Sequence, residues 1–217
     1  TVDAMLNNET YFYREHSVFD DIAKTALEHI RETNAAKRRV TIWHCGVSTG
    51  QEAYSMAMLL AEQGEQWAGW QVDVVGTDVS YHAISRARVG LYSQFEIQRG
   101  LPVQRMVRWF DQTEGGWLAK ADLRRRIDFS VQNMLVDRPP LASPADLIFC
   151  RNLLLYFSLP MRQKAFARLR SVAAPQSFLV LGAGETVLGQ TDQFVASRRL
   201  RGLYEPADQQ VRAPVAA

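Results

Sequence analysis

The sequence predicts an α/β protein with a doubly wound, mostly parallel β-sheet, and three observations support this prediction. Apolar, strand-like runs alternate with amphipathic helical segments from about residue 17 onward. The strand-like runs are apolar almost throughout, which is typical of parallel strands that helices cover on both faces. No internal repeat or low-complexity tract interrupts the alternation, and 217 residues are enough for one large domain with a substantial core.

The first part of the chain alternates helices and strands. Phe19, Ile22 and Ile30 recur at helical spacing, and Ser17 precedes them as a candidate N-cap. Two strand-like runs follow, and each leads through a turn into a helix. The expected bounds are 17–32 for the first helix, 40–45 and 70–80 for the strands, and 51–63 and 81–90 for the helices that follow them.

The second part begins with a less regular stretch, residues 91–126, and then returns to the alternating pattern. The expected elements are a strand at 126–134, a buried strand starting at 145, a helix at 158–174, a strand at 177–185 and a hairpin at 194–207. Right-handed crossovers between parallel strands bring the turns after the first two strands to one edge of the sheet. Ligands bind at this edge in such folds.

Composition excludes several classes of protein. A net charge of +2 argues against a dedicated nucleic-acid binder, and no apolar run reaches the roughly 18 residues that a membrane-spanning helix needs. The chain starts without a basic segment followed by an apolar one, so we expect no signal peptide, no membrane insertion and a cytoplasmic location. It also starts without an initiator methionine, and we expect it to be part of a longer protein.

The cysteines and histidines form no metal-binding pattern. Cys45 and Cys150 lie in separate apolar runs without a CxxC spacing, so we expect two buried thiols in a reducing compartment and no metal site. The histidines are scattered along the chain, and we expect them at surface or packing positions: His16, His29, His44 and His82.

Asp78 ends the second predicted strand, at the edge of the sheet where the first glycine turn also lies. An acidic residue there is placed to accept hydrogen bonds from both ribose hydroxyls of an adenosine. The alternative is that Asp78 caps the helix that starts nearby. Both NAD enzymes and methyltransferases use an acidic residue at this position, so Asp78 indicates an adenosine ligand without choosing its chemistry.

Glu52 lies in the first helical turn after Gly50, where a pyrophosphate would normally meet backbone N–H groups. A carboxylate there repels phosphate but suits S-adenosylmethionine, which has a positive charge and no phosphate. The alternative is that Glu52 only complements the helix dipole. The turn has neither a P-loop lysine nor a GxGxxG pattern, and we expect Gly46 and Gly50 to let a cofactor approach closely.

The chain contains five long motifs, which are, in order, NNETYFYRE, STGQEAYSMAMLL, VVGTDVSYHAISRARVGLY, FSVQNML and ADLIFCRNLLLYF. Together they resemble one family, the CheR-type chemotaxis receptor methyltransferases, and the likeness runs from about residue 7 to residue 188. The resemblance implies the C-terminal catalytic domain of such an enzyme. Its fold would be that of a class I methyltransferase, a Rossmann-like sheet with a small antiparallel β-subdomain.

The resemblance also implies a reaction, partners and site residues. The family transfers a methyl group from S-adenosylmethionine to glutamate side chains on the helical signalling domains of receptors, giving glutamyl γ-methyl esters and S-adenosylhomocysteine. Arg14 and Tyr156 match residues that line the family's reaction centre. The implied cofactor contacts are Asn8, Thr10, Arg14, Glu52, Asp78, Asn133, Met134, Asn152 and Leu153.

These residue types suit the implied chemistry. A glutamate side chain has a pKa of about 4.3, so it is an anion at neutral pH and needs no general base. Arg14 is suited to orient the incoming carboxylate through charge-assisted hydrogen bonds, and Tyr156 to donate another. Each residue also has an alternative interpretation: Arg14 is a surface arginine, Tyr156 caps a core strand, and Asn152 only shapes a turn.

The sequence departs from the family pattern at a few places. Gln51 and Ala53 replace the residues that commonly flank the matched glutamate, and a proline lost at a helix start costs a little rigidity. The family's usual N-terminal helical domain is not part of this sequence. The small β-subdomain, expected at about 108–128, is short relative to members that bind a receptor's pentapeptide tether, which favours recognition without a tether.

The resulting domain plan has three parts. Residues 1–16 are a cofactor-contacting segment that links to the helical domain, residues 17–205 are the methyltransferase domain, and residues 206–217 are a tail. Two basic clusters are each either a solvated face or a contact for an acidic receptor surface. One is the run 124–126, and the other is a helix face with Arg162, Lys164, Arg168 and Arg170.

Two other functions remain as alternatives to a protein-glutamate methyltransferase. A non-catalytic module that senses S-adenosylmethionine would keep Asp78 and the glycine turn but would not depend on Arg14 or Tyr156. An NAD-dependent oxidoreductase is disfavoured by the absence of GxGxxG and by the charge of Glu52 at the phosphate position.

Overall fold

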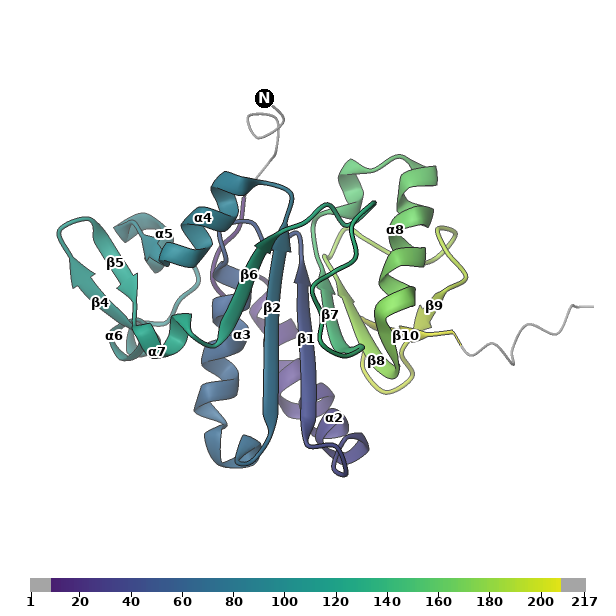
Figure 1. The fold of residues 1–217 in the computed structure, drawn as a ribbon, viewed down its shortest axis with the longest axis horizontal. Helices are drawn as coiled ribbons and strands as arrows, with labels where there is room; N and C mark the ends of the chain where they lie inside the picture. The colour runs from purple at the N-terminus through teal and green to yellow at the C-terminus, as the bar shows by residue number, and fades with distance from the viewer. Residues whose placement is uncertain (1–8, 208–217) are drawn as a thin grey trace, which may run out of the picture.

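The computed structural model describes residues 9–207, which fold around a seven-stranded β-sheet (Figure 1). The strands lie in the order β6-β2-β1-β7-β8-β10-β9. The first five of these are parallel, and β10 is antiparallel to both of its neighbours, which confirms the predicted doubly wound, mostly parallel sheet. The bounds are β1 Arg39–Cys45, β2 Gln71–Asp78, β6 Ile127–Val131, β7 Ala145–Cys150, β8 Ala173–Leu181, β9 Phe194–Ala196 and β10 Leu203–Pro206.

Neighbouring residues of the central strands point to opposite faces of the sheet and enter two separate apolar cores. In β1, Val40 and Ile42 belong to one core, whereas Trp43 and Cys45 belong to the other. Because both faces are buried, these strands are apolar almost throughout instead of alternating with polar residues.

Helices cover both faces of the sheet (Figure 1). Ile30 and Met56 come from helices on one face and Phe166 and Leu169 from α8 on the other, and each pair packs in the core of its own face. The helical segments are α1 His16–Asp21, η2 Ile22–Ala26, α2 Leu27–Thr33, α3 Gln51–Glu62, α4 Tyr81–Val89 and α8 Leu159–Val172.

A second, three-stranded antiparallel sheet stands outside the β6 edge of the large sheet (Figure 1). The predicted antiparallel insertion is therefore present. It begins before the predicted residue 108, with β3 at Leu91–Tyr92. The sequence does not reveal this strand, because two residues are too few for a recognisable alternation. The bounds are β3 Leu91–Tyr92, α5 Gln94–Gln98, α6 Val103–Trp109, β4 Phe110–Thr113, β5 Gly116–Ala119 and α7 Ala121–Arg124.

Two local predictions are wrong. The first helix begins at His16 and Ser17 is not its cap; the N-cap position is Glu15, which is left-handed and makes no side-chain capping bond. The predicted strand at 177–185 is displaced, because β8 starts at Ala173 and ends at Leu181. The strand tolerates Pro175 because this residue lies in its more exposed first part. The hairpin at the end of the chain is confirmed by β9 and β10.

Residues 9–15 lie against the rest of the domain and are held there by backbone contacts. The backbone N–H of Tyr13 donates to Ser55 Oγ of α3 at 3.0 Å, and the ring of Phe12 is fully buried. The carbonyl oxygen of Phe12 lies so close to Gly100 that a Cβ at Gly100 would be 2.0 Å from it. This contact fixes the segment that precedes Arg14.

Within residues 9–207, no helix has both the length and the apolar character needed to cross a membrane. Of the tail expected at 206–217, Pro206 belongs to β10, and residues 208–217 lie outside the described part of the chain.

We predict that Gly100→Ala destabilises the protein by about 2 to 4 kcal/mol, because the new methyl group meets Phe12 and the backbone is left-handed, with φ +87°. Gly189→Ala is the matched control, since Gly189 also has a positive φ, +68°, but no atom lies within 4 Å of the place that its new methyl group would take. We expect it to cost only about 1 kcal/mol. Denaturant unfolding measures both, and equal losses would contradict a special role for the contact.

Candidate functional site

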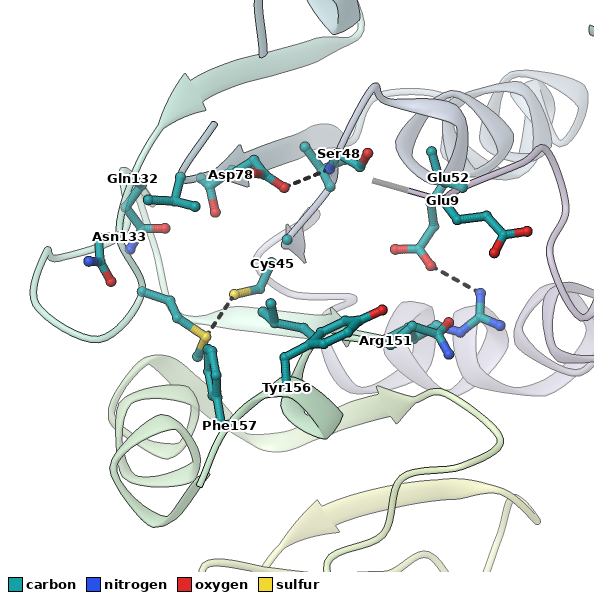
Figure 2. Close-up of a pocket in the computed structure, with 18 of the residues that line it drawn as sticks. Glu9, Cys45, Ser48, Glu52, Asp78, Gln132, Asn133, Arg151, Tyr156 and Phe157 are labelled. Atoms are coloured by element: carbon teal, nitrogen blue, oxygen red, sulfur yellow. Dashed lines mark hydrogen bonds and ion pairs between the residues drawn. The ribbon is translucent and has the colours of Figure 1, made fainter. Parts of the chain in front are cut away.

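The carboxyl ends of the parallel strands surround a pocket of about 320 Å³. Its walls come from the segments that follow β1, β2, β6 and β7, and from residues 9–14. In Figure 2, Asp78 and Asn133 lie toward one end of the pocket, Glu52 and Arg151 lie toward the other, and Tyr156 lies along one side. A pocket at this edge is where open α/β sheets bind ligands.

The structure brings nearly all of the predicted site residues together. Asn8 lies outside the described residues. The others all line the pocket: Thr10, Arg14, Glu52, Asp78, Asn133, Met134, Asn152, Leu153 and Tyr156. Among residues 9–207, no group of three or more His, Cys, Asp or Glu side chains is arranged to hold a metal ion.

Asp78 is nearly buried and is oriented by two backbone hydrogen bonds. Its Oδ2 accepts from the N–H of Ser48 and its Oδ1 from the N–H of Ser80, both at 2.9 Å. The cap of α4 is Ser80, whose hydroxyl accepts from the N–H of Ala83. Asp78 therefore does not cap this helix. Its carboxylate lines the pocket, and a carboxylate oxygen has the capacity to accept more than one hydrogen bond.

The first three residues after β1 do not offer their N–H groups to a phosphate. The N–H groups of Gly46 and Val47 donate to the carbonyl of Thr77, and that of Ser48 donates to Asp78. Gly46 lines the pocket with φ +74°. Gly50 is the left-handed N-cap of α3 and packs against the helix α4. Of the two glycines, only Gly46 lines the pocket.

Glu52 forms a charged cluster with two partners. Its Oε1 accepts from His44 Nδ1 at 2.9 Å, and its Oε2 accepts from Arg151 Nη1 at 3.0 Å. Burial favours a raised pKa for Glu52, but the hydrogen bond from His44 and the positive charge of Arg151 outweigh it, so the pKa lies below its ordinary value. The carboxylate is thus kept ionised beside the pocket.

Arg151 connects Glu52 to the N-terminal segment. Its side chain is only 1% exposed, and its Nη2 contacts Glu15 Oε2 at 3.0 Å and donates to the carbonyl oxygen of Arg14 at 3.0 Å. Burial opposes the charged guanidinium, but the carboxylates of Glu52 and Glu15 raise the pKa of Arg151 above its ordinary value. One buried arginine therefore fixes both a carboxylate of the pocket and the backbone of Arg14.

Sequence reasoning did not identify His44 or Arg151. His44 is fully buried and stacks on Phe149 with ring centroids 4.3 Å apart, so the expected packing role is confirmed but is incomplete without the bond to Glu52. A usable signal existed for Arg151, since it directly follows a buried strand that ends at the predicted ligand edge.

Comparison with known proteins supplies the family. The profile of the family described as "CheR methyltransferase, SAM binding domain" matches residues 8–201. The chain belongs to the CheR methyltransferase family. Chemotaxis protein methyltransferase 1 of Vibrio cholerae is 37% identical over 89% of this chain and 70% of its own length. Chemotaxis protein methyltransferase 1 of Pseudomonas aeruginosa is 33% identical over 89% of this chain and 71% of its own length.

Among solved structures, a TehB-like SAM-dependent methyltransferase from Corynebacterium glutamicum aligns with a TM-score of 0.43 and 16% identity, over 77% of this chain and 78% of that one. The strand order, with an antiparallel β10, and the family together confirm the predicted class I methyltransferase fold. They also confirm the predicted resemblance, the methyltransferase activity and S-adenosylmethionine as the cofactor.

The pocket of this CheR family member fits S-adenosylmethionine in its chemistry. Asp78 offers carboxylate oxygens at the ribose position of such sheets, and the ionised Glu52 offers negative charge to a ligand with a cationic sulfonium and amino group. Apolar side chains of the lining next to Asp78 and Asn133 in the chain, namely Val79, Met134 and Leu135, suit a purine ring. The engaged N–H groups of the first turn agree with a ligand without phosphate.

The thiols of Cys45 and Cys150 lie in the same apolar core, and Cys45 also forms part of the pocket wall. Both are buried and free, as predicted. Cys45 lines the pocket and its S–H contacts Met134 Sδ at 3.5 Å. A hydrogen bond with Cys45, together with burial, raises the pKa of the Cys150 thiol well above its ordinary value, so Cys150 stays protonated and unreactive.

We predict that Glu52→Gln lowers the free energy of unfolding at pH 7 by about 3 kcal/mol, because it leaves the buried Arg151 guanidinium with one carboxylate partner instead of two. The difference from wild type should depend on pH. Since the pKa of Glu52 is lowered by folding, its contribution is complete above the ordinary value of 4.5 and is lost as the pH falls through the lowered pKa.

Urea unfolding of wild type and variant at a series of pH values measures this difference. Glu114→Gln is the control, because Glu114 lies exposed in the turn between β4 and β5. A difference for Glu52→Gln that is independent of pH between 7 and 3 would contradict the assignment of a lowered pKa to Glu52.

Proposed function

We propose that this chain methylates glutamate side chains on the helical signalling domain of a chemoreceptor, using S-adenosylmethionine. The observation that carries the proposal is the gathering of Asp78, Glu52, Arg14 and Tyr156 around one pocket in a chain of the CheR family. The relatives' names support the chemotaxis setting, since both are called chemotaxis protein methyltransferases.

The predicted cofactor contacts divide between the two ends of the pocket. We assign Asp78 to the ribose hydroxyls, and Asn133 and Met134 to the adenine end. Asn133 Oδ1 accepts from the N–H of Leu135, so its side chain is already held by its own loop. We assign Glu52 to the amino-acid end, with Thr10, Arg14, Asn152 and Leu153. Asn8 lies outside the described residues and stays a predicted cofactor contact.

The reaction requires no general base from the protein. The bound cofactor supplies a methyl group on a sulfonium sulfur, and the acceptor glutamate is ionised at neutral pH. The remaining task is to hold the carboxylate oxygen in line with the methyl carbon at about 3 to 3.5 Å. Arg14 and Tyr156 suit this task, because their side chains line the pocket and offer cationic and hydroxyl donors.

Tyr156 lies where an acceptor from another protein can reach it. It ends the short helix η4, Leu154–Tyr156, and is 55% exposed, unlike a residue that caps a core strand. A surface glutamate can therefore approach the pocket from this side. The receptor's helical signalling domain is the partner we propose, which implies that the enzyme works in the cytoplasm, and we propose recognition without a pentapeptide tether.

Four arginines of the basic clusters form hydrogen bonds or an ion pair within the domain. Arg125 pairs with Asp122, and Arg124 donates to the carbonyl of Val89 at 3.4 Å. In the α8 cluster, Arg162 donates to Phe157 O and Arg168 to Val136 O. These bonds favour a structural role for the four arginines over direct contact with an acidic receptor surface.

The proposal is tested by transfer of a tritiated methyl group from S-adenosylmethionine to an isolated receptor signalling domain. We expect label on glutamate that alkali releases as methanol, because carboxyl methyl esters hydrolyse in base and N-methyl groups do not. Label that survives alkali would contradict glutamate as the acceptor. Binding of S-adenosylhomocysteine without any transfer would favour the non-catalytic sensing module, and binding of NAD would favour the oxidoreductase.

We predict that Asp78→Asn weakens binding of S-adenosylhomocysteine at least about tenfold, since a neutral amide accepts poorly from ribose hydroxyls and loses its charge-assisted bonds. Isothermal titration calorimetry measures the affinity. Asp73→Asn is the matched control, because Asp73 lies in the same strand and pairs with Arg39 outside the pocket. An unchanged affinity in Asp78→Asn would remove Asp78 from the cofactor site.

We predict that Tyr156→Phe lowers kcat for methyl transfer by roughly 10- to 100-fold, the loss typical of a hydrogen-bond donor at a reaction centre. Affinity for S-adenosylhomocysteine should stay within about twofold, since the ring remains. Tyr81→Phe removes another hydroxyl from a largely exposed tyrosine, in α4, and should change neither quantity. A Tyr156→Phe enzyme with normal kcat would contradict the role of the hydroxyl.

A further inference from the structure

We propose that Glu185 is a positioning residue for the loop that carries Asn152, Leu153 and Tyr156. This inference rests on the proposed function of that loop. Glu185 follows β8, in the turn that begins at Gly182, and does not line the pocket. Its carboxylate nevertheless contacts the backbone of the loop that does.

The carboxylate accepts four backbone hydrogen bonds. Oε2 accepts from the N–H of Asn152 at 2.7 Å and from that of Gly182 at 2.8 Å. Oε1 accepts from the N–H of Leu154 at 2.7 Å and from that of Leu155 at 3.3 Å. Three of the four donors therefore belong to the loop that follows β7, and they lie between 30 and 33 residues away in the chain.

These donors are N–H groups that the loop itself leaves without an acceptor. Leu154 and Leu155 begin η4, whose N-cap residue, Leu153, makes no side-chain capping bond. The first N–H groups of a helical turn have no partner inside the turn, so a carboxylate from elsewhere can satisfy them. Glu185 thus fixes the start of the turn that Tyr156 ends.

The contact also supports an unusual backbone conformation. Asn152 has φ +57°, a left-handed value that costs energy in a residue with a side chain. The two loops approach so closely there that a Cβ on Gly182 would lie 2.7 Å from Asn152 Nδ2. The bond from Asn152 N–H to Glu185 helps to hold this conformation.

Backbone N–H groups, and not a cation, balance the charge of Glu185. None of the ion pairs formed within residues 9–207 includes it. A glutamine at this position has one acceptor oxygen and one NH₂ donor in place of two acceptors. Glu185→Gln therefore turns a donor toward two of the four N–H groups, whereas Glu185→Asp keeps both oxygens on a shorter side chain.

The test measures S-adenosylhomocysteine affinity by calorimetry and kcat for methyl transfer at saturating S-adenosylmethionine. For Glu185→Gln we expect about tenfold weaker binding, through Asn152 and Leu153, and a roughly tenfold or larger loss of kcat, as for a reacting group displaced by about 1 Å. Glu185→Asp should recover part of both losses. Glu205→Gln is the matched control, because Glu205 also accepts a hydrogen bond, from Ser197, but lies in β10 away from the pocket.

A double-mutant cycle with Tyr156→Phe separates positioning from general damage to the fold. If Glu185 acts on kcat through Tyr156, adding Glu185→Gln to Tyr156→Phe should lower kcat by no more than about threefold. Losses that multiply in full would overturn the proposal, as would a Glu185→Gln enzyme with wild-type kcat and affinity. If Glu185→Gln fails to fold, the same cycle is run with Glu185→Asp.

The outcome is distinguishable from failure of the proposed function. A wild-type chain that transfers no methyl group to any receptor domain refutes the function, but the calorimetric comparison still tests Glu185, because it needs no acceptor. A wild-type chain that methylates the receptor while Glu185→Gln does so equally well refutes only the role of Glu185.

Discussion

The buried guanidinium of Arg151 is the interaction on which the pocket depends. It joins three parts of the chain that are distant in sequence: the end of β7, the first turn of α3 through Glu52, and the N-terminal segment through Glu15 and the carbonyl of Arg14. Burying a charge is costly unless it is fully paired. The folded state therefore strongly favours the one arrangement in which all of these groups meet.

This arrangement separates two uses of the N-terminal segment. Arg151 holds the backbone of Arg14, so the Arg14 side chain is not consumed in anchoring and lies at the pocket, where Nη1 donates to Glu9 O at 3.0 Å. Both Tyr13 and Glu15 have left-handed backbones, with φ 50° and 59°. Such strain persists when the surroundings determine the conformation, and here Ser55 and Arg151 provide the opposing bonds.

Much of this structure follows from the sequence, and the two residues missed around the pocket, Arg151 and Glu185, share one physical cause. The positions of Asp78 and Glu52 after buried strands predicted that they meet at one sheet edge, and the strand pattern predicted the sheet itself. Arg151 and Glu185 escaped prediction because their partners lie 99 residues away, in Glu52, and 33 residues away, in Asn152. Hydrogen bonds between side chains so far apart in the chain produce no periodic pattern in the sequence. A hydrogen bond to a backbone N–H group does not depend on which residue carries that group, so the sequence does not reveal it either.

Burial along the pocket matches the division of labour in methyl transfer. Met134 and Asp78, which we assign to the adenosine part of the cofactor, are 6% and 9% exposed, whereas Tyr156 is 55% exposed. A cofactor that arrives alone can be enclosed, but a glutamate presented by a folded receptor can enter only where the pocket stays open. Since the acceptor is already an anion, the enzyme needs rigid donors at that opening more than it needs a base. The segment that carries Arg14 is held by the buried Arg151, and the loop that carries Tyr156 is held by the carboxylate of Glu185. Both donors are therefore fixed in place.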